Sequence, residues 1–140
     1  MSDETLMDME LVKAFDATGR AELTKRFTEK RPASYDDIFA QLCEVLAKDC
    51  DRLSNTPDLE RITVIDHGEY QGTRVFVVGE TGYQPHVYWI ACVSYGSCSS
   101  CDTFEAIGVE SYSGDKTTER EVGEYVTLAL HILQSMRRVR

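Results

Sequence analysis

Two kinds of hydrophobic spacing divide this sequence into helical ends and a strand-rich middle. Towards both ends, apolar residues recur every three or four positions, as expected for helices with one buried face. Between residues 62 and 95 the period shortens towards two and β-branched residues become common, which favours strands. We therefore predict an α+β fold in which two main amphipathic helices pack against an antiparallel meander of three or four strands.

Helical spacing begins over residues 5–15, where Leu6, Met9, Val12 and Phe15 share one face, and resumes over 21–27 after an interruption at Gly19. We interpret residues 1–31 as an N-terminal helical extension, built as one broken helix or two short ones, and residues 32–140 as a single α+β domain. The apolar face of the extension can pack on that domain or on a second chain. A homodimer through the N-terminal helix is one expectation, and the oligomeric state stays open.

A longer helix is predicted over residues 35–53. Ser34 can cap its N-terminus, and Asp36 and Asp37 would lie in the first turn, where the helix dipole favours negative charge. We expect Cys43 and Cys50 to be core thiols. The apolar positions that define the helix are Ile38, Phe39, Leu42, Leu46, Cys50 and Leu53.

The last helix is predicted to begin after Thr118, because Thr118 and Glu121 have the spacing of a capping box. Arg137, Arg138 and Arg140 would lie at its C-terminal end, where positive charge is favourable. His131 is expected to be packed or at the boundary of the apolar face. That face would cover the sheet beside the 35–53 helix and consists of Val122, Tyr125, Val126, Ala129, Leu130, Ile132, Leu133 and Met136.

Strands are predicted over residues 62–65, 75–78 and 87–95, and the glycines between them suit hairpin turns. Both faces of the third strand are apolar, with Trp89 and Ala91 on one and Ile90 and Cys92 on the other. We therefore expect this strand to be central in the sheet or covered on both sides, with Cys92 in the core.

Composition narrows the class of protein. The chain has 140 residues, 42% of them hydrophobic, which suits one domain with a real core. Asp and Glu number 24 against 15 Lys and Arg, and the resulting formal charge of -9 argues against nucleic-acid binding. No apolar stretch is long enough for a membrane span, and the acidic start is unlike a signal peptide, so we expect a cytoplasmic protein. Five cysteines form no even framework, which favours reduced thiols.

Acidic residues are concentrated where the strands are predicted. Residues 61–115 contain seven acids and only two bases, Arg61 and Arg74. This charge would attract a basic protein partner. The acids are spaced singly, which argues against a mimic of nucleic acid, and a solvated acidic surface is the simpler alternative.

The segment that follows the third strand carries the candidate chemistry. Small residues surround two thiols three positions apart, and Asp102 could cap a short helix, so the chain can turn sharply and expose its backbone amides. Tyr70 and Gln71 of the facing hairpin would lie beside it. We predict a recognition surface made by Tyr95, Ser97, Cys98, Ser99, Ser100, Cys101 and Asp102.

Three alternatives for the two thiols stay open. They can belong to a compact turn without further function, or to a zinc-stabilised module that uses Cys98 and Cys101. The other zinc ligands would come from His67, His86, His131 or Cys92, and His67 and His86 are favoured because both lie at hairpin ends. Without zinc, no cofactor is expected. A thiol-dependent enzyme of thioredoxin type is disfavoured because all three prolines precede the motif. The sequence also lacks phosphate-loop, dinucleotide, zincin and serine-hydrolase motifs, which favours a non-enzymatic protein.

The string Y-G-S-C-S-x-C-D at residues 95–102, preceded by Tyr70-Gln71-Gly72-Thr73 and Tyr88-Trp89, resembles a group of small uncharacterised proteins of bacteriophages and some bacteria. No activity of that group can be transferred to individual residues. The resemblance implies a phage-type accessory protein that acts on a host component in the host cytoplasm. The sequence as a whole therefore predicts a non-enzymatic accessory protein that binds a host or viral macromolecule through residues 95–102.

Overall fold

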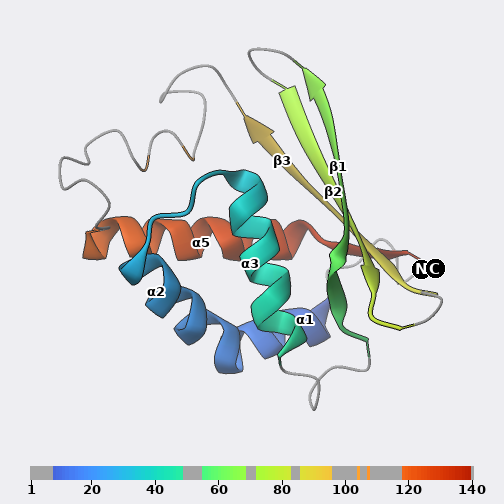
Figure 1. The fold of residues 1–140 in the computed structure, drawn as a ribbon, viewed down its shortest axis with the longest axis horizontal. Coiled ribbons are helices and arrows are strands. Elements are labelled where there is room, and N and C mark those ends of the chain that lie inside the picture. The colour runs from blue at the N-terminus through green and yellow to red at the C-terminus, as the bar shows by residue number, and fades with distance from the viewer. Residues whose placement is uncertain are drawn as a thin grey trace.

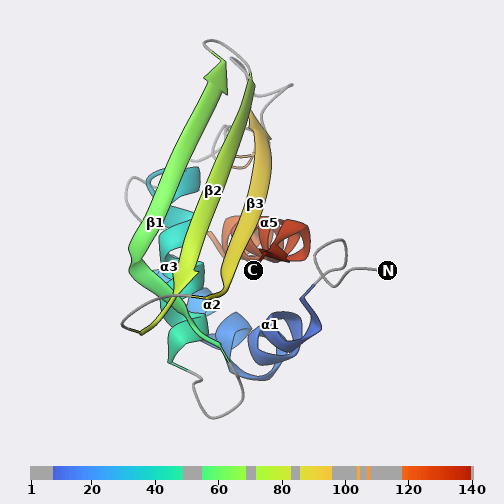
Figure 2. The same cartoon turned by 90° about the vertical axis from the view of Figure 1, so that its right-hand side faces the viewer.

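The computed structural model describes residues 8–48, 55–68, 72–82, 86–95, 104, 107 and 118–139, and it confirms the α+β class. One antiparallel sheet has the order β1 (Pro57–Gly68), β2 (Gly72–Glu80), β3 (Tyr88–Tyr95) and β4 (Arg137–Val139). The helices lie on one face of this sheet (Figure 1 and Figure 2). No helix among the described residues has both the length and the hydropathy that crossing a membrane requires. The helical elements are α1 (Met9–Ala14), η2 (Phe15–Gly19), α2 (Arg20–Glu29), α3 (Tyr35–Ala47) and α5 (Glu119–Ser135).

The predicted interruption at Gly19 is a change of winding and not a break. α1, η2 and α2 continue one another with right-handed helical backbone at their junctions, and only Phe15–Gly19 is wound as a π-helix. A Cβ atom on Gly19 would lie 3.2 Å from the Phe15 ring and 3.5 Å from Val45 of α3. Glycine therefore lets the π-helical turn approach α3 closely.

The N-terminal helices belong to the same hydrophobic core as the rest of the domain. Five of their apolar residues are buried against α3 and α5. Of the face predicted to pack on the domain or on a second chain, Phe15 is buried, Val12 is partly buried, Met9 is 53% exposed and Leu6 lies outside the described residues. The buried residues are Leu11, Ala14, Phe15, Leu23 and Phe27.

Both predicted helix starts are confirmed by their caps. The Asp37 N–H donates to Ser34 Oγ at 3.2 Å, which begins α3. Thr118 and Glu121 form the expected capping box at the start of α5. α3 ends at Ala47, with Lys48 as its C-cap, and the predicted continuation over residues 49–53, including Cys50, lies outside the described residues.

β3 is central in the sheet, as predicted, but only one of its faces is covered. Trp89 and Ala91 are fully buried against the helices, whereas on the opposite face Tyr88 is 39% exposed and Cys92 is exposed. The expectation that Cys92 is a core thiol is therefore wrong. Cys43 on α3 is buried, as predicted.

Arg137 and Arg138 lie in a strand, which corrects the prediction that they lie at the C-terminal end of the last helix, and Arg140 lies outside the described residues. α5 ends at Ser135, Met136 takes an extended backbone, and Arg137–Val139 pair with Tyr88–Ile90 of β3. The cause is a contact between residues far apart in the sequence. Arg138 Nη2 lies 2.9 Å from Asp8 Oδ2, and Asp8 Oδ2 also accepts a 2.8 Å hydrogen bond from the buried indole of Trp89.

We expect Asp8→Ala to lower the free energy of unfolding by about 3 kcal/mol, because it leaves a buried indole N–H and a largely buried guanidinium without their shared acceptor. Urea unfolding at neutral pH measures this loss. Glu10→Ala is the control, since Glu10 also pairs with Arg138 but is 42% exposed, so its removal should cost less than about 1 kcal/mol. Equal losses in the two variants would contradict the central role of Asp8.

Candidate functional site

The structure describes the two supports of the predicted binding loop. Tyr95 ends β3 before the loop, and Phe104 and Ile107 follow it. The described part of the candidate site therefore consists of the strand ends that precede the loop and the surface of α5 that follows it. The remaining predicted site residues lie outside the described residues: Tyr70, Gln71, Ser97, Cys98, Ser99, Ser100, Cys101 and Asp102.

Four polar side chains tie the ends of three strands to α3. Arg74 of β2 makes a bidentate pair with Asp36 of α3, with Nε–Oδ1 at 2.5 Å and Nη2–Oδ2 at 2.8 Å. Arg74 Nη1 also contacts Asp66 Oδ2 of β1 at 2.8 Å, and the Tyr95 hydroxyl donates to Asp66 Oδ1 at 2.5 Å. We call Asp36, Asp66, Arg74 and Tyr95 the strand-end cluster. It fixes the last residue before the loop to β1 directly and to α3 through Arg74.

Hydrogen bonding also shifts two pKa values in the strand-end cluster. The pKa of Arg74 is raised above its ordinary value, mainly by the hydrogen bond to Asp36. The pKa of Tyr95 is raised, mainly because its hydroxyl donates to the Asp66 carboxylate. Both shifts favour the forms that make these hydrogen bonds, the guanidinium of Arg74 and the neutral phenol of Tyr95.

Phe104 fixes the chain on the other side of the loop. Its backbone N–H donates to the Tyr35 hydroxyl at 3.0 Å, and its ring lies 5.4 Å from that of Tyr35 and 5.6 Å from that of Tyr125. Sequence reasoning missed this anchor, although Phe104 and Ile107 have the spacing of two residues on one helix face. Residues 96–103 therefore join two residues that are both fixed to the domain.

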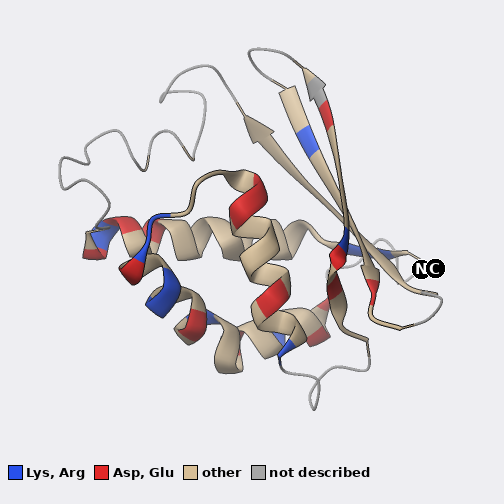
Figure 3. Cartoon of the chain, in the orientation of Figure 1, with Lys and Arg blue, Asp and Glu red and all other residues tan. Residues whose placement is uncertain are grey.

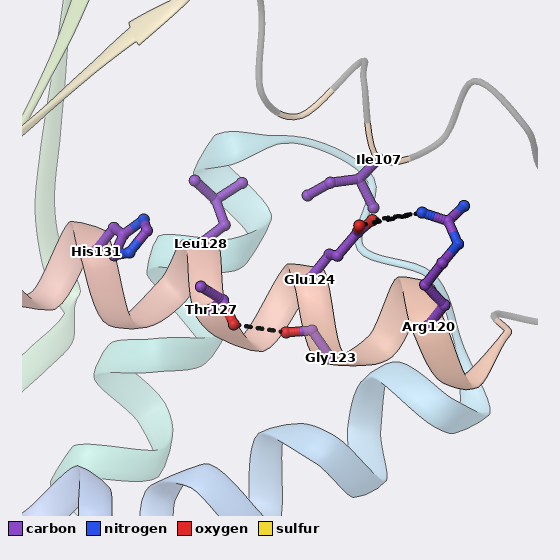
Figure 4. A pocket seen from close by; sticks show the side chains of 7 residues that line it. All are labelled: Ile107, Arg120, Gly123, Glu124, Thr127, Leu128 and His131. Carbon is purple, nitrogen blue, oxygen red and sulfur yellow. Dashed lines mark hydrogen bonds and ion pairs between the residues drawn. The ribbon is translucent and has the colours of Figure 1, made fainter.

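A surface hollow of about 540 Å³ lies on α5 beside Ile107. Figure 4 shows Ile107 over the helix face from which Glu124, Leu128 and His131 project. Arg120 Nη1 lies 3.0 Å from both carboxylate oxygens of Glu124 at one end of the hollow. Ile107 and Leu128 make its middle apolar, so the hollow can take an apolar side chain with polar groups beside it. The lining residues are Ile107, Arg120, Gly123, Glu124, Thr127, Leu128 and His131.

His131 is exposed at this hollow, so it is not packed in the core. The buried face of α5 includes Leu128, Ile132 and Leu133. His131 lies three residues after Leu128 and projects with it from the helix face that lines the hollow (Figure 4), so it lies at the boundary of the apolar face, one of the two placements that the sequence predicts.

The sheet register separates the two histidines of the zinc hypothesis. His67 pairs with Thr73, whereas His86 precedes Tyr88, which pairs with Gly79. From Thr73 to Gly79 the strand rises about 20 Å at roughly 3.3 Å per residue, while a zinc–nitrogen bond is about 2 Å. A single ion therefore cannot bind both His67 and His86, and that part of the hypothesis is wrong.

The described residues do not test whether the two cysteines of the zinc hypothesis bind zinc. Cys98, Cys101 and the side chain of His67 lie outside it. Among the described residues, no three His, Cys, Asp or Glu side chains are grouped so that they could hold a metal ion. Zinc binding by Cys98 and Cys101 thus stays a prediction.

A substitution at Gly123 tests whether the floor of the hollow is open. A Cβ atom at this position would meet no atom within 4 Å, so Gly123→Ala should stabilise the protein by about 1 kcal/mol through the higher helix propensity of alanine. Thermal or urea unfolding measures the gain. Gly19→Ala is the control and should not be stabilising, because its Cβ would lie 3.2 Å from the ring of Phe15, which is fully buried and has little room to move. A loss of stability in Gly123→Ala would mean that another group fills this floor.

The Tyr95–Asp66 hydrogen bond predicts a pH dependence. Because the folded-state pKa of Tyr95 is raised, the bond stabilises the fold fully below the ordinary tyrosine pKa of about 10 and is lost as the pH rises through the raised value. The stability difference between wild type and Tyr95→Phe should be constant from about pH 7 to 9 and shrink above pH 10. In an Asp66→Asn background this pH dependence should disappear. A difference that grows with pH would contradict the assignment.

Comparisons with known proteins add no relative to this description. No family model, curated protein or solved structure matches the chain. What the protein binds is therefore inferred from its own residues.

Proposed function

We propose that this protein is a non-enzymatic accessory module that binds a basic protein partner at the end of its sheet. The binding surface comprises the strand-end cluster, residues 96–103 and the hollow on α5. The observation that carries the proposal is that residues 96–103 run between two fixed residues, Tyr95 and Phe104. Loops positioned by rigid elements at both ends commonly carry recognition.

Charge supports a basic partner. The two bases of the strand region are already engaged within the chain: Arg74 by Asp36 and Asp66, and Arg61 by the carbonyl oxygens of Glu80 and Gly82. The seven acids of residues 61–115 therefore leave this region negative. Such a surface attracts a positively charged protein and raises its association rate.

The hollow on α5 supplies the apolar part of such an interface. Interfaces gain most of their free energy where an apolar or aromatic side chain enters a pocket and loses contact with water. Ile107 and Leu128 are each only 5% exposed and present a narrow apolar edge here, and the absence of a side chain at Gly123 leaves room beside that edge. The resemblance of residues 95–102 to small phage proteins extends the proposal to a host or viral partner.

The proposal is tested by crosslinking with a photoreactive amino acid placed at Ser99, with Thr24 on the exposed side of α2 as the control position. We expect one basic protein of the host extract to be crosslinked from position 99 and not from position 24. With that protein purified, Ser99→Arg should weaken binding at least about tenfold, because the added side chain obstructs the centre of the interface. Thr24→Arg makes the same change of charge and should leave the affinity unchanged.

The salt dependence of the affinity is a second measurement. The affinity should fall as the salt concentration rises from about 50 to about 300 mM, because the attraction between an acidic and a basic surface is screened. Equal effects of Ser99→Arg and Thr24→Arg would place the interface elsewhere. An affinity that rises with salt would contradict a basic partner.

A further inference from the structure

One edge of the sheet is protected and the other is open. β4 is only three residues long and carries Arg137 and Arg138, and beyond it the Ser135 hydroxyl accepts a hydrogen bond from the Cys92 N–H at 3.3 Å and lies 3.4 Å from the Cys92 carbonyl oxygen. Short strands, positive charge and covering side chains are the usual means of preventing edge-to-edge pairing. At the opposite edge, β1 pairs only with β2 among the described strands.

The open edge is long, regular and uncharged in its middle. β1 keeps one register with β2 from Ile62 to Gly68, and its irregularity is confined to the part between Pro57 and Ile62. Residues 62–65, Ile-Thr-Val-Ile, are all β-branched and contain no glycine, proline or charge. Figure 2 shows β1 at the margin of the sheet, and Figure 3 shows this stretch without charged residues.

Exposure confirms that this edge faces solvent. Residues 63–66 are all exposed, although successive residues of a strand point to opposite faces. Val64 is 36% and Ile65 is 52% exposed, whereas Phe76, the β2 partner of Val64, is fully buried. Solvent therefore reaches Val64 on the helix-covered face and Ile65 on the opposite face, although α3 packs against β1, as expected for a strand at the margin of the sheet.

The charges that flank this stretch are directed into the chain's own sheet. Arg61 donates to the Glu80 and Gly82 carbonyl oxygens, and Asp66 is held by Arg74 and Tyr95. These side chains therefore do not guard the edge in the way that outward lysines would.

We propose that β1 pairs with β1 of a second copy of this chain, antiparallel and about a two-fold axis normal to the sheet, to form one continuous eight-stranded sheet. Such an axis keeps the helices of both copies on the same face and places a residue opposite its own counterpart at the centre. The uncharged β-branched stretches of the two copies then lie beside each other. This pairing is favourable because β-branched residues opposite each other stabilise paired strands.

Charge selects the register. Centring the pair on Thr63 would place Glu60 opposite Asp66 of the second copy, and like charges in direct opposition are destabilising. Centring it on Val64 avoids this pair and aligns residues 60–68 of both copies, with Thr63 opposite Ile65. The paired edges cover about 300 Å² per copy, from about 30 Å of strand and about 10 Å of height, which is below the roughly 800 Å² of a standard interface. The dimer is therefore weak and depends on concentration.

Sedimentation analysis of the wild type, Val64→Lys and Val75→Lys, under reducing conditions and over a wide concentration range, tests the dimer. The wild-type mass should rise from 15.8 kDa towards twice that value, and more readily at high salt, because two copies of net charge -9 repel each other. Val64→Lys should weaken association at least about tenfold, because two lysines then face each other at the axis. Val75→Lys, the same change on the open face of β2, should associate like the wild type.

Backbone amide exchange of residues 59–66 is the second measurement, and it does not depend on a substitution. Exchange should slow as the concentration rises, because the free N–H groups of β1 become hydrogen-bonded. A mass that stays at 15.8 kDa with unchanged exchange would overturn the proposal. Loss of association in Val75→Lys but not in Val64→Lys would also overturn it, because the copies would then stack through the open face of the sheet. The opposite salt dependence separates this association from binding of a basic partner.

Discussion

The carboxylate of Asp8 is the contact on which the arrangement of the chain depends. It caps α1, accepts the indole N–H of the fully buried Trp89, and pairs with Arg138 of β4. It thus joins the first helix, the central strand and the last strand, which are far apart in the sequence. Removing a carboxylate and a guanidinium from water is costly, and the cost is offset here because several donors share the same carboxylate. The fold around β3 is therefore specified by polar contacts as well as by burial.

The parts of the fold that could be predicted from the sequence are those with local causes. Ser34 and Thr118 mark helix starts through contacts with residues three positions away, and the short apolar run of residues 87–95 between turn residues identifies a strand. β4 could not be predicted in this way. Arginines after a helical stripe are equally suited to a helix C-terminus, and what decides their conformation is the pairing of Arg138 with Asp8 at the other end of the chain.

The candidate site shows the same division between local and distant causes. The end of β3 could be located from the sequence, and with it Tyr95 as the start of the loop, but its partners Asp66 and Arg74 come from two other strands. Burial was predicted less well. Cys92 lies in an apolar stretch, yet it is exposed because the sheet is covered on one face only. Which face of an apolar strand is covered depends on how many layers the fold has, and a single sequence does not encode that locally.

The two surfaces that we propose meet on β1. Asp66 belongs to the strand-end cluster and also ends the uncharged stretch of the open edge. Antiparallel pairing centred on Val64 places Asp66 of each copy opposite Ile62 of the other, so the two Asp66 residues lie four residues, or about 13 Å, apart along the strands. The two strand-end clusters of a dimer are therefore neighbours on the helix-covered face of the shared sheet. The net charge of the chain acts on the two proposed surfaces in opposite directions, because it would attract the proposed basic partner to the sheet end and would oppose the approach of a second acidic copy at the edge. A bound basic partner would reduce that repulsion, so occupation of the sheet end would favour pairing of the edges.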